Sequence, residues 1–189
     1  MRRTICLAAV ALLAASPALA HPGQEASGFL HPFSGLDHLL AMVGVGLWAG
    51  LLAERKPTAG ILVPASFLAM MAIGAAAGFA GIKLPLVEAA ILASVFVIGG
   101  LIIGAVRLPV AWAMAVVGLF AAFHGYAHAL EAPAAGAGTY ILGFLMATAL
   151  LQAVGLALGW GVRRAVGDLG VRALGGVVLA AGAVVLITN

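Results

Sequence analysis

Six apolar runs follow one another along the chain, separated only by short polar connections. They cover residues 35–53, 59–80, 86–106, 109–130, 140–162 and 173–188. Each run is about 16–23 residues long, and about 20 apolar residues in an α-helix cross the hydrocarbon core of a bilayer. The pattern therefore predicts an all-α integral membrane protein, with residues 21–189 forming one domain of six transmembrane helices. Six crossings also allow two inverted three-helix halves, although the halves share no evident sequence similarity.

The composition excludes a water-soluble domain. The chain is 65% hydrophobic and 8% charged, whereas a soluble domain carries about 25% charged residues because its surface faces water. The net charge of +3 does not indicate a nucleic-acid partner, because the basic residues are spread over short loops. The single cysteine, Cys6, lies in a segment that we expect to be removed. The remaining chain then has no thiol for disulfides, cysteine zinc sites or iron–sulfur ligation.

Residues 1–20 have the pattern of a secretory signal peptide that is cleaved from the mature protein. Arg2 and Arg3 form a positive start, and residues 5–15 form an apolar run that is too short to span a bilayer. Residues 18–20 (ALA) then supply a cleavage signal of small residues. Cleavage after this signal leaves His21 as the mature N-terminus, outside the cytoplasm.

The basic loop residues predict the same orientation as the signal peptide. Counting crossings from an external residue 21 places all but one of them on the cytoplasmic side: Arg55, Lys56, Arg107, Arg163, Arg164 and Arg172, against Lys83 outside. An excess of basic residues in the cytoplasmic loops is the usual bias of membrane proteins. We therefore predict a multi-pass protein of the bacterial inner (cytoplasmic) membrane, with its mature N-terminus in the periplasm.

Histidines and carboxylates gather at the predicted periplasmic face. The candidate metal ligands there are His21, His31, Asp37, His38, Glu88, His124, His128 and Glu131. Ionisable side chains inside membrane spans are costly and usually functional. His124 and His128 are four residues apart and therefore share one helix face. Imidazoles and carboxylates without thiolates suit Ni²⁺, Co²⁺, Zn²⁺ or Cu²⁺.

Simpler explanations exist for single residues of this set. A lone histidine in a span can hydrogen-bond to a neighbouring helix, and His21 can be an ordinary terminal residue. Asp37 and Glu88 lie at helix N-termini, where the helix dipole alone favours a carboxylate. Because several separate helices place such side chains at one depth, we favour a metal site facing the periplasm.

Two segments carry a resemblance to a known family. Residues 31–42 (HPFSGLDHLLAM) continue into residues 45–49 (VGLWA), and residues 123–131 read FHGYAHALE. These segments resemble the two histidine-rich signatures of the HupE/UreJ family of hydrogenase and urease accessory membrane proteins. The resemblance implies a permease, not an enzyme, that carries nickel and sometimes cobalt for nickel-enzyme maturation. It implies metal-handling roles for His31, Asp37, His38, His124, His128 and Glu131.

We therefore expect a divalent transition metal as the transported substrate, and the lipid bilayer and this ion as the partners. The sequence contains no phosphate-binding G-x-x-x-x-G-K-[ST] motif, so uptake does not use ATP hydrolysis by this chain. Two alternatives are an intramembrane zinc-dependent hydrolase and a b-haem protein with histidine axial ligands. The choice of metal, the coupling ion, a homo-oligomeric state and the cytoplasmic half of the path stay open at this level.

Overall fold

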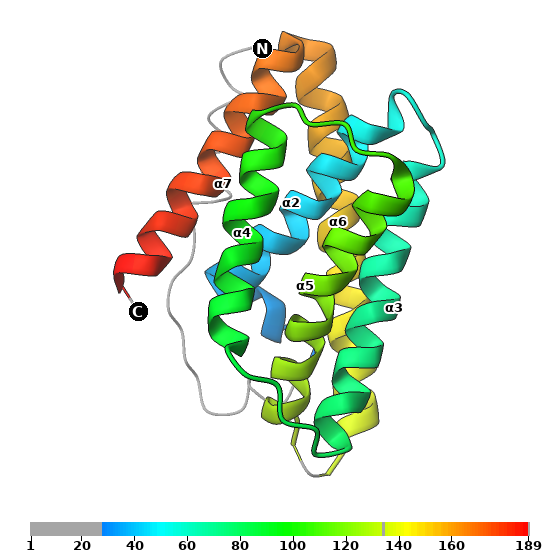
Figure 1. Cartoon of the computed structure of the whole chain (residues 1–189), viewed down its shortest axis with the longest axis vertical. Helices are drawn as coiled ribbons and strands as arrows, with labels where there is room; N and C mark the ends of the chain where they lie inside the picture. The colour runs from blue at the N-terminus through cyan, green and yellow to red at the C-terminus, as the bar shows by residue number, and fades with distance from the viewer. Residues whose placement is uncertain (1–27, 134, 189) are drawn as a thin grey trace.

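The computed structural model describes residues 28–133 and 135–188, and every regular element in this part is helical. The elements are η1 (His31–Phe33), α2 (Leu36–Ala53), α3 (Ala59–Phe79), α4 (Val87–Ile103), α5 (Val110–Glu131), α6 (Ala137–Val166) and α7 (Asp168–Thr188). The six long helices follow the order of the six predicted spans (Figure 1). The predicted signal peptide and His21 lie outside the described residues.

Five of these helices are long and apolar enough to cross a membrane, and α4 is a shorter apolar helix of 17 residues. At 1.5 Å per residue, α4 extends over about 26 Å, a little less than the hydrocarbon core of about 30 Å. Local thinning of the bilayer accommodates such a difference at small cost. The fold confirms the predicted class, an all-α integral membrane protein.

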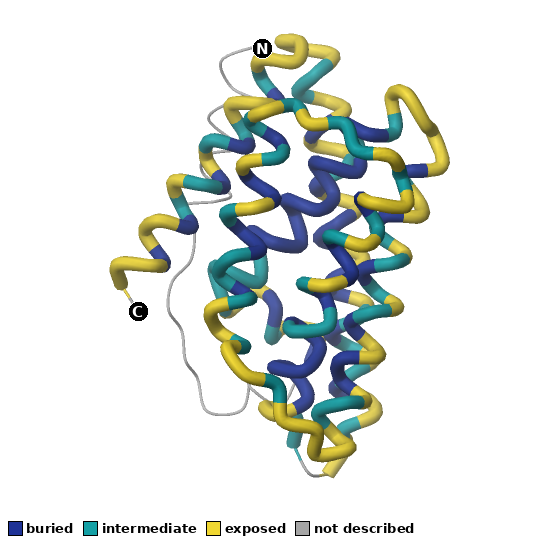
Figure 2. Tube along the Cα trace, in the orientation of Figure 1, coloured by how far each residue is buried: buried dark blue, intermediate teal, exposed yellow. Residues whose placement is uncertain are grey.

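Helix α2 lies at the centre of the bundle. It contacts α3, α4, α6 and α7, and Figure 2 shows its trace as mostly buried. The other long helices each keep an exposed apolar face, as a membrane span that contacts lipid does. Side chains on α2 are therefore surrounded mainly by protein, which makes this helix suited to carry the polar groups of an internal site.

Two helix crossings are so close that only glycine fits. A side-chain carbon at Gly46 of α2 would strike the backbone carbonyl of Gln152 in α6. One at Gly125 of α5 would strike the backbone carbonyl of Met71 in α3. In lipid, helices associate through such close packing because apolar side chains gain little by leaving the lipid tails. The most extensive helix contacts are accordingly α3 with α5 and α2 with α6, followed by α4 with α7.

The two ends of the bundle carry different polar side chains. We call the end with His31 and Glu131 the histidine end, and the end with Glu54 and Arg163 the basic end. At the basic end, Arg107 Nη2 contacts Glu54 Oε2 at 2.7 Å, and Arg163 pairs with both Glu54 and Asp168. These ion pairs connect α2, the α4–α5 loop, α6 and α7.

The helices at the basic end differ from the predicted bounds. Residues 163–172 were expected to form a loop, but α6 continues to Val166 and α7 begins at Asp168. Gly167, with a φ of 77°, makes the turn between them. The third predicted span ends at Ile103, not at residue 106. An apolar run marks the part of a helix that lies in hydrocarbon, and a helix can continue beyond it where water or basic side chains satisfy its last carbonyls.

Candidate metal centre

Four imidazole rings form a continuous row at the histidine end, which we call the histidine row. It runs from His31 in η1 to His128 in α5, then to His38 in α2 and His124 in α5. Neighbouring ring centres are 4.9, 4.8 and 5.0 Å apart in that order. The structure thus brings together side chains from three elements that the sequence placed at one depth.

Glu131 joins the first part of the row into a group of ligand atoms that suits a metal ion. Its Oε2 is 2.7 Å from His31 Nε2 and 3.8 Å from His128 Nδ1. The ligand atoms of this trio all lie within 4.8 Å of one another. Atoms that share one ion at about 2.1 Å are separated by about 3 Å or slightly more. The trio therefore needs only small side-chain adjustments to hold a divalent cation.

Asp37 orients His38 in the deeper part of the row. The carboxylate Oδ1 accepts hydrogen bonds from the ring Nδ1 of His38 at 2.9 Å and from its backbone N–H at 2.8 Å. Because an ionised carboxylate only accepts, the ring proton lies on Nδ1, and Nε2 has a free lone pair. This Nε2 is buried without a hydrogen-bond partner among the described residues. A carboxylate that holds the far side of a ligating imidazole is a common arrangement in metal sites.

Ser94 of α4 orients the ring of His124 in the same way, by a hydrogen bond to one ring nitrogen. Its hydroxyl donates its one proton to the Ile91 carbonyl at 2.6 Å, so His124 Nε2–H is the donor in the 3.1 Å contact with Ser94 Oγ. The lone pair of His124 is then on Nδ1, which is buried without a partner in the described part of the chain. Sequence reasoning missed Ser94, although a single hydroxyl residue in the apolar run of α4 was a usable signal.

Aromatic side chains enclose the row. Phe144 of α6 stacks on His128 at 4.6 Å, Phe67 of α3 lies 5.8 Å from the ring of His124, and Tyr140 of α6 lies 5.8 Å from that of His31. His124 and His128 are fully buried. Enclosure of this kind keeps competing water away from the ligand atoms and fixes the ring positions.

The local sequence explains how His31 and the Asp37–His38 pair come to face each other. Pro32 starts the short η1 turn, and Gly35 precedes α2 in an extended conformation. A side chain at Gly35 would lie only 3.0 Å from Asp37 Oδ1 and 3.1 Å from His38 Nδ1. Asp37 is in the first turn of α2, where the helix dipole stabilises its charge.

Two predicted ligands are not part of this arrangement. Glu88 is exposed in the first turn of α4, and the metal-suited trio and ion pairs of the described residues do not include it. His21 lies outside the described residues. Both assignments stay predictions. The other six predicted residues meet at the histidine end.

The fold and the site define a helical membrane protein with imidazoles and carboxylates clustered inside one end of its bundle. The profile of the HupE/UreJ protein family matches residues 8–185. The chain is 43% identical over 189 aligned residues to Protein HupE of Rhizobium leguminosarum bv. viciae, an alignment that covers 97% of this chain and 96% of that protein. No solved structure matches the chain significantly. The chain therefore belongs to the HupE/UreJ family, as its two histidine-rich segments predicted.

Proposed function

We propose that this protein takes up a divalent transition metal, nickel first and cobalt second, across the cytoplasmic membrane for the maturation of metalloenzymes. The observation that carries the proposal is the histidine row, in which neighbouring ring centres are about 5 Å apart. In this function the histidine end faces the periplasm, as the signal peptide and the basic loops predict.

The burial of the row supports transport better than storage of a fixed ion. The side chains are 51% exposed for Glu131 and 21% for His31, against 12% for His38 and 0% for His128 and His124. An ion captured by the exposed carboxylate can exchange one imidazole for the next as it moves inward. Each step replaces one ligand while others still hold the ion, which keeps the barrier to its movement low.

The donor atoms fit nickel and cobalt. Nitrogen and oxygen sites bind divalent ions with affinities that rise from manganese through iron and cobalt to nickel, so raw affinity favours nickel over these metals. Family membership supports the same choice. Copper and zinc bind such donors as well, and their exclusion in the cell depends on geometry and availability.

The close packing of the row disfavours a haem protein. His38 lies against both His128 and His124 with ring centres 4.8 and 5.0 Å apart, which leaves no room for a porphyrin between them. A zinc hydrolase needs an open coordination position that a substrate can reach. In the described structure the deeper rings of the row are enclosed by aromatic side chains.

The test measures ⁶³Ni accumulation in cells that lack other nickel systems. We expect His38→Ala and His128→Ala to reduce accumulation to the level of cells without the protein. Lys83→Ala is the control, because Lys83 is an exposed residue between α3 and α4, outside the histidine row. Wild-type accumulation in both histidine variants, at equal protein levels, would contradict the proposal.

A further inference from the structure

A buried polar strip on α6 lies next to the histidine row, on the side toward the basic end. Thr148 and Gln152 are four residues apart on one helix face, and both are at most 1% exposed. Neighbouring core positions on α6, such as Phe144 and Leu151, are apolar. Polar side chains inside a bundle usually hydrogen-bond to a neighbouring helix, so a buried one that lacks a partner calls for another explanation.

The hydroxyl of Thr148 lies between two thioethers from different helices. Its Oγ1 is 3.2 Å from Met42 Sδ in α2 and 3.7 Å from Met71 Sδ in α3. Met42 is one turn beyond His38 on α2, so this group continues directly from the histidine row. Because the hydroxyl has one proton and two sulfur neighbours, at least one sulfur keeps its lone pairs free.

Gln152 is the second part of the strip, about 6 Å further toward the basic end. Neither its side-chain oxygen nor its side-chain nitrogen has a hydrogen-bond partner among the described residues. An unsatisfied buried amide destabilises the fold, so its presence at this position needs a reason. Gly46 of α2 lies against the Gln152 backbone, so the close helix crossing fixes α6 at the level of this side chain.

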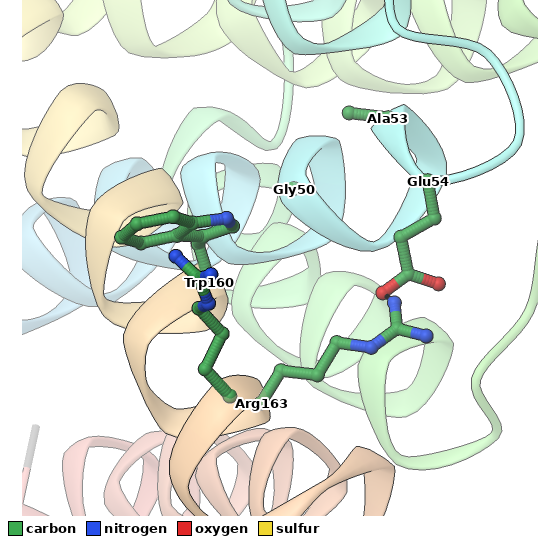
Figure 3. Close-up of a pocket in the computed structure, with 6 residues that line it drawn as sticks. Gly50, Ala53, Glu54, Trp160 and Arg163 are labelled. Carbon is green, nitrogen blue, oxygen red and sulfur yellow. Dashed lines mark ion pairs between the residues drawn. The ribbon is translucent and has the colours of Figure 1, made fainter.

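The strip leads toward a pocket at the basic end. The pocket has a volume of about 470 Å³. It is lined by Gly50 of α2 and Glu54 directly after α2, together with Trp160 and Arg163 of α6. Figure 3 shows the carboxylate of Glu54 facing the guanidinium of Arg163 within this pocket. Polar or sulfur-bearing side chains thus continue from the histidine row as far as Gln152, and beyond it the buried positions of α6 are glycines, Gly155 and Gly159.

We propose that Met42, Met71, Thr148 and Gln152 form an inner binding site at which the metal ion pauses after leaving the histidine row. This inference rests on the proposed function and deepens it, because it supplies donor atoms in a part of the path that the ionisable residues do not mark. Thioether sulfur, hydroxyl oxygen and amide oxygen are neutral donors. They hold a divalent ion more weakly than imidazole and carboxylate, and weak binding lets a transported ion leave again.

The test measures nickel binding and nickel transport in the same variants of the full-length protein. Nickel binding is titrated in purified protein, and ⁶³Ni uptake is measured as an initial rate in cells. Gln152→Leu, Thr148→Val and the double variant Met42→Leu/Met71→Leu keep side-chain size while removing donor atoms. We expect an unchanged affinity at the histidine row and an uptake rate lower by about tenfold, the factor that ~1.4 kcal/mol of lost binding produces.

Two controls separate coordination from packing. Met70→Leu changes the neighbouring methionine of α3, which is only half-buried and packs against Gly118, and it should leave uptake unchanged. Thr148→Ser keeps the hydroxyl and should retain most uptake, whereas Thr148→Val should not. Methionine and leucine have similar volumes, so the methionine variants remain folded even if Gln152→Leu does not.

The outcomes distinguish this site from the histidine row. If the three inner variants, Gln152→Leu, Thr148→Val and Met42→Leu/Met71→Leu, transport nickel like the wild type while His38→Ala does not, the inner site is overturned and the proposed function stands. If Thr148→Ser is as defective as Thr148→Val, the hydroxyl is not a ligand and the inner site is likewise overturned. If the wild type neither binds nor transports nickel, both proposals fail together.

Discussion

Replacing Ser94 with alanine tests whether α4 positions a metal ligand that it does not itself supply. In the wild type, Ser94 Oγ accepts the Nε2–H of His124 at 3.1 Å, and the Nδ1 lone pair is left without a partner among the described residues. Ser94→Ala removes this acceptor and adds no new group. The His124 side chain, which is fully buried, can then rotate or change its protonated nitrogen, and it presents its lone pair less often.

Two independent estimates give the size of the effect. Loss of a side chain that orients a metal ligand typically weakens metal affinity by about 10- to 100-fold. A buried N–H left without an acceptor costs about 1–3 kcal/mol, and about 1.4 kcal/mol corresponds to tenfold in affinity. The second estimate corresponds to about 5- to 150-fold, so the two estimates overlap at a nickel affinity about 10- to 100-fold weaker in Ser94→Ala.

The assay is a nickel titration of purified protein by competition with a chelating dye. Ser66→Ala is the matched control, because Ser66 is a half-buried serine of α3 whose hydroxyl bonds only to the Val63 carbonyl at 2.8 Å. The control should bind nickel like the wild type. An unchanged affinity of Ser94→Ala, in a protein where His124→Ala binds nickel weakly, would refute the positioning role of Ser94.

Three further predictions concern other parts of the molecule. Asp37→Ala removes the acceptor that fixes His38 and should weaken nickel affinity by about 10- to 100-fold in the same titration. Gly125→Val forces a side chain into the α3 backbone and should lower stability by about 1–3 kcal/mol, measured as a lower Tm in detergent. Arg163→Ala should change stability by less than about 1 kcal/mol, because its pairs are partly exposed and Glu54 keeps its contact with Arg107.

The sequence predicted the helices and most of the ligands for one physical reason. A bilayer requires long apolar runs, so six such runs predict six helices in order, and an imidazole inside a run stands out because it is costly there. These features can be recognised in the sequence without knowing which helices pack against each other. His38, His124 and His128 were predicted in this way, and His31 was predicted from its place just before the first run at the same face. All four lie together in the structure.

The residues that were missed depend on which helices are neighbours. Ser94 matters only because α4 packs beside the face of α5 that carries His124. Thr148 matters only because α6 packs between the sulfurs of α2 and α3. Hydrophobic runs give the order of helices along the chain but not their arrangement across the membrane. For the same reason, the sequence did not reveal that Glu88 is exposed and is not part of the metal-suited trio.

The two closest helix pairs lie on either side of the histidine row. The closest crossings join α2 to α6 and α3 to α5. If α2–α4 and α5–α7 are the two halves, α2 corresponds to α5 and α3 corresponds to α6. The α2–α6 pair then corresponds to the α5–α3 pair, which is the relation that inverted halves require. The row crosses between the pairs, because His38 lies on α2 and both His124 and His128 lie on α5.

A pair of disulfide cross-links tests whether the helix pairs move as units. Cysteines at Gly44 of α2 and Ile98 of α4 would have Cβ atoms 3.9 Å apart, and cysteines at Gly118 of α5 and Met70 of α3 would have them 3.7 Å apart. Both separations suit a disulfide, whose Cβ atoms are about 3.5–4.5 Å apart. The first cross-link joins the α2–α6 pair to α4, which packs most closely on α7, and it should stop ⁶³Ni uptake until it is reduced. The second cross-link lies within the α3–α5 pair and should have no effect. Equal uptake with both cross-links fully formed would show that the bundle transports nickel without relative movement of its helix pairs.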